Sequence, residues 1–300
     1  MEIRAFRRIL VGIDLSKASL PLAEFMIGVA WRHDVELVFA YVVDELIVEH
    51  ASAGYDPNKL IEALVSEARK TLEDLVARAS ERGVKARYVI YDTPSDPAVA
   101  LALLAEREQA TEIAIAHKGH RLFRIIPIGG TALSLISHSD IPVLVAKASA
   151  VEDKVRVMLR SGTGAEDLLR RIMITVDSNT SSSMLEYLAA LISRAGESLE
   201  EVYVIHVIEP GEDEVQAKKI VDSTVKFLQG TFPGVRSIIL EGARPYKEIL
   251  AAARQLEITL LVAGRTVKRE KGLLEAILGS TLNRLILHSD IPVLVYPISK

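Results

Sequence analysis

An eight-residue segment occurs twice in the chain without a single change. His138-Ser139-Asp140-Ile141-Pro142-Val143-Leu144-Val145 returns as His288-Ser289-Asp290-Ile291-Pro292-Val293-Leu294-Val295, at an interval of 150 residues (288 − 138) in a chain of 300. A second correspondence joins residues 8–14 to residues 171–177, and both of these segments end in an aspartate after an apolar run. A repeat of this length has the size of a domain and not of a solenoid unit. The sequence therefore predicts two copies of one domain in tandem.

Within each copy, short apolar runs alternate with longer runs of helical periodicity. The predicted strands are residues 9–13, 37–43, 84–91, 113–116 and 143–146 in the first copy, and 172–176, 202–208, 235–240, 260–263 and 293–296 in the second. Such alternation requires crossover connections and therefore a mostly parallel sheet with helices on both faces. We expect an α/β fold with two tandem five-stranded, parallel, doubly wound domains.

The predicted domains cover residues 1–147 and 168–300. Between them, residues 148–167 have no counterpart before the first copy, and they contain Ser161-Gly162-Thr163-Gly164. A stretch of this composition is typical of a polar, flexible linker, so we predict a linker here.

Composition limits the class of protein. With 49% hydrophobic and 25% charged residues, the chain can bury two ordinary cores, and a net charge of −4 argues against a nucleic-acid partner. No run approaches the roughly 18 apolar residues of a membrane span, and no signal peptide is recognisable, so we expect a cytoplasmic protein without membrane contact. The lack of cysteine excludes disulfides, thiol catalysis and zinc-thiolate sites.

Ligands of open α/β sheets bind at the carboxyl ends of the strands, where the strand order reverses. Asp14 and Asp177 follow the first predicted strand of the two copies. Each carboxylate either caps the next turn or hydrogen-bonds a hydroxyl or amino group of a ligand. Taken alone, the position favours the capping role.

Glycines and basic residues follow the fourth strand of the second copy. Gly264-Arg265 comes directly after that strand, and Gly279-Ser280-Thr281 opens the last helix. The segment between them includes Lys268, Arg269 and Lys271. A glycine and hydroxyl pair at a helix amino terminus with positive charge nearby meets the requirements of a phosphate site. The alternative is a solvated basic loop followed by an ordinary helix cap.

Taken together, these motifs resemble the universal stress protein family, here as a tandem pair. The resemblance rests on the aspartate after strand one, the glycine after strand four, the Gly-Ser/Thr at the last helix and the closing Pro-Val-Leu-Val strand. It implies a Rossmann-like fold of the adenine nucleotide alpha hydrolase type, and a pseudo-dimer in which the copies pair through their last strands. A further homodimer or a protein partner is compatible with it.

The implied ligand is ATP or another adenine nucleotide, and the implied role lies in stress response or regulation. The resemblance leaves open whether magnesium accompanies the nucleotide. In the second copy the implied nucleotide-binding residues are Asp177, Val207, Ala263, Gly264, Arg265, Gly279, Ser280 and Thr281. In the first copy they are Asp14, Val42, His117, Gly130 and Thr131.

The family pattern reads Gly, two residues, Gly, nine residues, Gly, then Ser or Thr. In the second copy Gly264 and Gly279 match the outer positions, but Val267 replaces the middle glycine and the loop is two residues longer. In the first copy the length is right, but His117 and His120 stand at the first two glycine positions. A side chain there crowds a phosphate, so we expect the second copy to be the better site.

Metal binding and catalysis find little support. His117 and His120 lie in a glycine-interrupted loop with no carboxylate nearby in the sequence, so we predict no metal site. The chain has no phosphate-loop lysine motif and no nucleophile elbow, so we predict no catalytic residue and at most slow ATP hydrolysis. The competing hypothesis is a regulatory or interaction protein whose degenerate pockets bind no nucleotide.

Overall fold

The computed structural model describes residues 5–44, 56–93, 96–117, 130–150, 157–159, 162–267 and 279–299. The first half contains β1 (Arg8–Gly12), α1 (Ser19–His33), β2 (Glu36–Asp44), α3 (Pro57–Glu81), β3 (Ala86–Thr93), α4 (Pro97–Arg107), β4 (Glu112–Ala116), α5 (Gly130–His138) and β5 (Val143–Ala146). The second half contains β8 (Arg171–Thr175), α6 (Ser182–Ala195), β9 (Glu201–Ile208), α7 (Glu214–Gln229), β10 (Val235–Glu241), α8 (Pro245–Gln255), β11 (Leu260–Val267), α9 (Ser280–His288) and β12 (Val293–Ser299). None of the described helices is long and apolar enough to cross a membrane.

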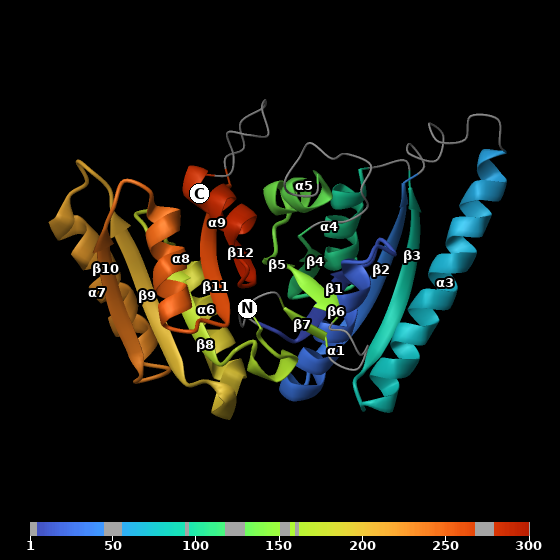
Figure 1. Ribbon diagram of the computed structural model, residues 1–300, viewed down its shortest axis with the longest axis horizontal. Coiled ribbons are helices and arrows are strands. Elements are labelled where there is room, and N and C mark those ends of the chain that lie inside the picture. The colour runs from blue at the N-terminus through green and yellow to red at the C-terminus, as the bar shows by residue number, and fades with distance from the viewer. Residues whose placement is uncertain are drawn as a thin grey trace.

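These strands form one ten-stranded sheet in the order β10-β9-β8-β11-β12-β5-β4-β1-β2-β3. Figure 1 shows the sheet crossing the molecule, with the first half in blue to green and the second in yellow to red. Within each half every strand pairing is parallel. This confirms the predicted α/β fold. The strand order reverses between β1 and β4 and between β8 and β11, so each half has one topological switch point.

The two halves meet through their last strands, β5 and β12, which pair in antiparallel fashion. Leu144 pairs with Leu294, and Val143 and Val145 pair with Val295 and Val293. The central pair joins equivalent residues of the two copies, since 294 − 144 = 150. Such self-complementary pairing is an isologous, two-fold contact. The pairing through the last strands that the family resemblance implies is confirmed.

Alternate residues of β5 and β12 enter two cores on opposite faces of the sheet. Leu144 and Leu294 pack in a core with α1, α3, α6 and α7, and the valines of both strands pack in a core with α4, α5, α8 and α9. This division follows from the two-residue period of a strand. Each core contains residues of both halves, so the two copies are packed as one body.

The repeated octapeptide forms the turn between the last helix and the last strand of each half. The Ser139 hydroxyl donates to the Ile141 carbonyl at 2.7 Å and accepts from the Ile141 amide at 3.2 Å. Ser289 and Ile291 repeat both bonds at 2.6 and 3.1 Å. Both serines are buried, so their hydroxyls satisfy backbone groups that water does not reach.

The described part of the segment between the halves is more ordered than predicted. β6 (Ala148–Ala150) and β7 (Val157–Leu159) form a two-stranded antiparallel sheet, and a short 3-10 helix spans Ala165–Asp167. All three elements lie against α1. A Cβ added at Gly28 in α1 would stand 2.5 Å from the Ala165 Cβ, so this glycine permits the contact. The described part of the predicted linker thus contains regular elements that the sequence analysis did not predict, because three-residue strands leave no periodicity to recognise in the sequence.

Leu144→Ala and Leu294→Ala test the shared core, since these buried side chains face each other across the pairing. We expect each change to lower the free energy of unfolding by about 2–5 kcal/mol. In the double variant we expect a departure from additivity of about 0.5–3 kcal/mol, because the two residues are in contact. Urea unfolding of the full chain measures these values.

Ile9→Ala and Ile172→Ala are the matched control, because these residues are equivalent and buried but lie on the separate strands β1 and β8. In the Ile9→Ala and Ile172→Ala double variant, the losses in free energy of unfolding should be additive. Additive costs for the leucine pair as well would contradict a core shared by the two halves.

Candidate functional site

The structure brings most of the predicted site residues of each half to the carboxyl ends of that half's strands. β8 lies between β9 and β11, and all three strands run parallel, so their carboxyl ends are neighbours. Asp177 follows β8, Val207 stands near the end of β9, and Gly264 lies in the second half of β11. In the first half, Asp14, Val42 and His117 occupy the corresponding edge.

The two aspartates make the same local hydrogen bond. The Asp14 carboxylate accepts from the Ser16 amide at 3.0 Å, and the Asp177 carboxylate accepts from the Asn179 amide at 2.7 Å. Each thereby closes a turn that leads to the next helix, which is the capping role that their position favours. Asp177 is exposed and stays accessible to a ligand.

The last helix of the second half, α9, begins without a hydrogen bond from the side chain of its N-cap residue. Gly279 precedes α9 and has no side chain, whereas Asp96, Ser181 and Asp213 cap α4, α6 and α7. Ser280 is exposed and Thr281 is half-buried, and in the first half Gly130 and Thr131 are both exposed. The first-turn amides of α9 are therefore placed to bind an anion.

Packing inside the protein accounts for Gly264. A Cβ at this position would stand 2.5 Å from Cδ1 of Ile298 and 3.2 Å from the sulfur of Met184. The missing side chain lets β12 and α6 pack closely over β11. By contrast, a Cβ added at Gly279 or Gly130 would meet nothing within 4 Å.

Arg265 does not point to a phosphate site. Its guanidinium is buried and donates to the carbonyl oxygens of Ser137 at 2.9 Å and Ser139 at 2.7 Å, at the end of α5 in the first half. Burial lowers the pKa of Arg265 from its usual value, which the nearby Asp140 partly offsets. The phosphate role predicted for Arg265 is therefore corrected to a contact between the halves, which no local sequence signal reveals.

The strand pairings also correct the alignment of the two copies. Val143 pairs with Ile113, and its repeat Val293 pairs with Leu261, so Ile113 and Leu261 are equivalent. The interval here is 261 − 113 = 148 residues, and the backbone confirms it, since Gln109 and Glu257 share a left-handed conformation at φ 53° and 51°.

By this register, Ala116 is the residue of the first copy that is equivalent to Gly264, and His117 is the residue equivalent to Arg265. The assignment of His117 to the first glycine position was wrong by one residue, and its side chain is buried. In the sequence, Ala116 is followed by two residues, Gly119, nine residues and Gly129, so the first copy keeps the family spacing, with Ala116 in place of the first glycine and Gly130 in place of the Ser or Thr. Gly119 and Gly129 lie outside the described residues, as do His120, Lys268, Arg269 and Lys271.

The apolar members of the predicted site belong to the core. Val207 and Ala263 are 5% and 3% exposed and pack under α8 and α9, and Val42 is half-buried. Val207 and Ala263 therefore contribute to packing beneath the ends of their strands.

Comparison with known proteins decides the family. The profile described as "Universal stress protein family" matches residues 5–147 and again residues 168–297. The chain belongs to the universal stress protein family.

Some relatives in the family match one half of this chain, and others match nearly its whole length. A universal stress protein of Methanocaldococcus jannaschii is 28% identical over 142 residues, which cover 47% of this chain and 82% of the relative. The structure of a universal stress protein from Archaeoglobus fulgidus superposes with a TM-score of 0.72 at 22% identity, over 98% of this chain and 97% of that one. A universal stress protein structure from Pseudomonas aeruginosa gives a TM-score of 0.57 at 17% identity, over 98% and 94%. These structures support the tandem fold alone.

One polar residue of this universal stress protein was not singled out from the sequence. His206 in β9 is buried, with Nδ1 2.7 Å from the Val176 carbonyl and Nε2 2.9 Å from the Glu212 carboxylate. The ring thereby ties the end of β8 to the loop before α7, beside Asp177. A histidine within the apolar run of a predicted strand was the available signal.

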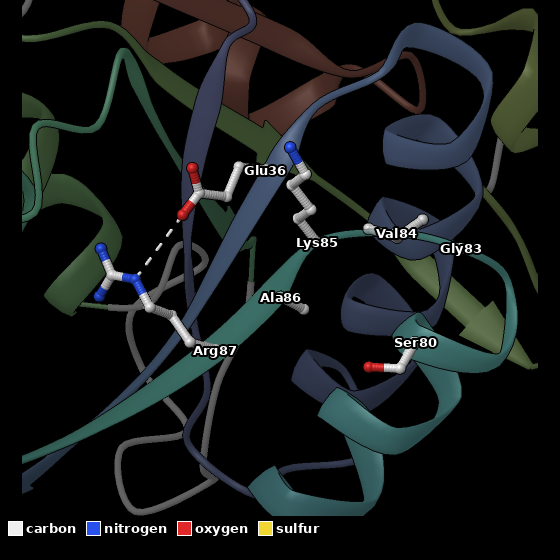
Figure 2. A pocket seen from close by; sticks show the side chains of 7 residues that line it. All are labelled: Glu36, Ser80, Gly83, Val84, Lys85, Ala86 and Arg87. Carbon is white, nitrogen blue, oxygen red and sulfur yellow. Dashed lines mark ion pairs between the residues drawn. The ribbon is translucent and has the colours of Figure 1, made fainter.

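A separate pocket lies at the opposite ends of the strands in the first half. It has a volume of about 440 Å³ and lies near the amino ends of β2 and β3. Figure 2 shows its lining residues, among them Glu36, Lys85 and Arg87. Arg87 pairs with Glu36 at 3.7 Å and also with Glu108. In this pocket the charge of Arg87 is compensated by Glu36 and Glu108. The pocket lies at the amino ends of its strands, whereas Asp14 and Asp177 follow the carboxyl ends of theirs.

The most perturbed carboxyl group of the described residues also lies away from the candidate site. Glu112, at the amino end of β4, is fully buried and accepts from the Phe6 amide and the Tyr187 hydroxyl at 2.8 Å, and from the Thr111 hydroxyl at 2.6 Å. Tyr187 belongs to α6, so this bond crosses between the halves. Burial raises the pKa of Glu112 to about 7, although the three donors and Arg194 act to lower it.

Glu112→Gln should make the protein more stable at pH 8. Because the folded chain holds the Glu112 proton up to about pH 7, against 4.5 for a free carboxyl, the wild type gains stability as the pH falls through this window. The glutamine variant lacks that titration and mimics the protonated acid. We expect its advantage to be on the order of 3 kcal/mol at pH 8 and to vanish near pH 4.5.

Urea unfolding of both proteins between pH 4.5 and 8 measures the difference. His33 also contributes to the pH dependence of stability, because burial, Arg32 and Arg194 lower its pKa to about 4. This contribution is the same in both proteins, so it cancels in the difference between their free energies of unfolding. A variant that is less stable than the wild type at pH 8 would contradict the assignment.

Proposed function

We propose that the chain is a universal stress protein that binds an adenine nucleotide and acts in stress response or regulation. The amino end of α9 carries the proposal. It offers uncapped amides, the Ser280 and Thr281 hydroxyls, and open space above Gly279. Helix amides and hydroxyl donors of this kind suit the phosphates of a nucleotide.

The other parts of the sheet edge would hold the nucleoside. The adenine would lie near Val207 at the end of β9, and exposed Asp177 would accept a hydrogen bond from the base or the ribose. ATP is the ligand that the family resemblance implies, with ADP and AMP as alternatives.

The second copy is proposed as the better site. Its last helix begins with two hydroxyl residues, Ser280 and Thr281, whereas the first copy has Gly130 at the position equivalent to Ser280 (280 − 130 = 150) and keeps only Thr131. Each missing hydroxyl removes one donor to a phosphate oxygen. The family spacing that the first copy retains makes it a second, weaker site.

A regulatory module that binds no nucleotide is the competing function. The observations that favour it are the local turns made by Asp14 and Asp177 and the packing of Ile298 over Gly264. These residues then have structural roles only, and the same titration separates the two functions.

Gly279→Val should abolish or greatly weaken binding of ATP. Because a Cβ at Gly279 meets nothing within 4 Å and the residue has φ −49°, the variant should fold like the wild type. The larger side chain would occupy the space of the phosphates, so we expect a loss of at least about tenfold, or 1.4 kcal/mol. Calorimetry with ATP, ADP and AMP measures it.

Gly130→Val is the control in the other copy, since it also adds a valine side chain in open space, at the position equivalent to Ser280. It should affect affinity less. No heat with any nucleotide in the wild type, or equal affinity in Gly279→Val, would refute nucleotide binding as described.

A further inference from the structure

Two cations cross the contact between the halves and reach equivalent carbonyl groups. Arg265 donates to Ser137 O at 2.9 Å and Ser139 O at 2.7 Å. In the opposite direction, the Lys147 ammonium donates to Leu287 O at 3.2 Å. Ser137 and Leu287 are equivalent (287 − 137 = 150), and each is the next-to-last residue of its helix, α5 or α9.

The repeated aspartates stand beside the same two cations. Lys147 pairs with Asp290 at 3.6 Å, and Asp140 acts on the charge of Arg265. The aspartate of each octapeptide thus helps to receive a cation from the other half, whereas the serine of each forms the turn before the last strand.

The two cations occupy different positions in their own halves. The residue equivalent to Arg265 is His117, by the strand register, and the residue equivalent to Lys147 is Pro297 (297 − 147 = 150). Each half therefore supplies one cation to the other half from its own strand region, and the exchange is reciprocal.

Such contacts matter because of helix length and charge. α5 and α9 have nine residues each, which is too short for a helix to be stable by itself in water. Their last carbonyls lack partners within the helix, and a cation there interacts favourably with the helix dipole. Arg265 is buried, so its hydrogen bonds are little exposed to competition from water.

We propose that Arg265 and Lys147 are positioning residues that make each candidate phosphate helix depend on the opposite half of the chain. Arg265 of the second copy holds α5, and Lys147 of the first copy holds α9. This inference rests on the proposed function for the ligand, while the capping itself is independent of it. Arg265 directly follows Gly264, so the phosphate edge of the second copy contacts the helix of the first.

Hydrogen exchange of the full chain without nucleotide tests the capping. In Arg265→Met we expect the amides of residues 130–138 to exchange about tenfold faster, because hydrogen bonds to a charged group are lost, with no change in residues 280–288. In Lys147→Met we expect the amides of residues 280–288 to exchange faster, with no change in residues 130–138. Arg265→Lys, which keeps the charge, should restore part of the protection of α5 and guards against a general loss of folding.

Titration with ATP tests the coupling. With the second copy blocked by Gly279→Val, Arg265→Met should weaken the remaining site about tenfold. With the first copy blocked by Gly130→Val, Arg265→Met should leave the ATP affinity of the second copy within about twofold of its value without this change. In the same background, Lys147→Met should weaken the ATP affinity of the second copy.

The two arms fail in different ways. Unchanged exchange of α5 in Arg265→Met and of α9 in Lys147→Met overturns the inference, whatever the nucleotide result. Altered exchange with unaltered ATP affinity overturns the positioning role. A wild type that binds no ATP refutes the proposed function, and the exchange experiment still decides whether the helices are capped across the halves.

Discussion

The antiparallel pairing of β5 with β12 is the contact on which the rest of the structure depends. Each half alone would end in an apolar edge strand, and such edges invite association. Pairing Leu144 with Leu294 removes both edges and brings residues of both halves into each of the two cores. It also places the end of each last helix within reach of a cation from the other half, so packing and helix capping follow from one strand contact.

Within each half, the carboxyl and amino ends of the parallel strands have different roles. The carboxyl ends carry Asp14 in the first half and Asp177 in the second, and the amino end of α9 offers accessible amides and hydroxyls. At the amino end of β4, the buried Glu112 carboxyl accepts a hydrogen bond from Tyr187 of the opposite half. The pH dependence expected of Glu112 thus concerns the contact between the halves, and the proposed ligand recognition concerns the carboxyl ends of the strands.

Much of the fold could be predicted, because strands and helices of ordinary length carry a clear period and the repeated octapeptide marks the duplication. The pairing of the two copies through their last strands was implied by the family resemblance. The site was harder. His117 was misaligned because the register of β4 depends on bonds to Val143, far along the sequence. Arg265 was taken for a phosphate ligand because its partners, Ser137 and Ser139, lie in the other half. Three-residue strands such as β6 leave no pattern at all.

A crystal structure of the full chain with ATP tests the account most directly. The account predicts phosphate oxygens within hydrogen-bond distance of the Ser280 and Thr281 amides, with the adenine at the ends of β8 and β9. It also predicts that Arg265 remains on Ser137 and Ser139. ATP bound near Glu36 at the amino ends of β2 and β3, or phosphates held by Arg265 in place of α5, would contradict it.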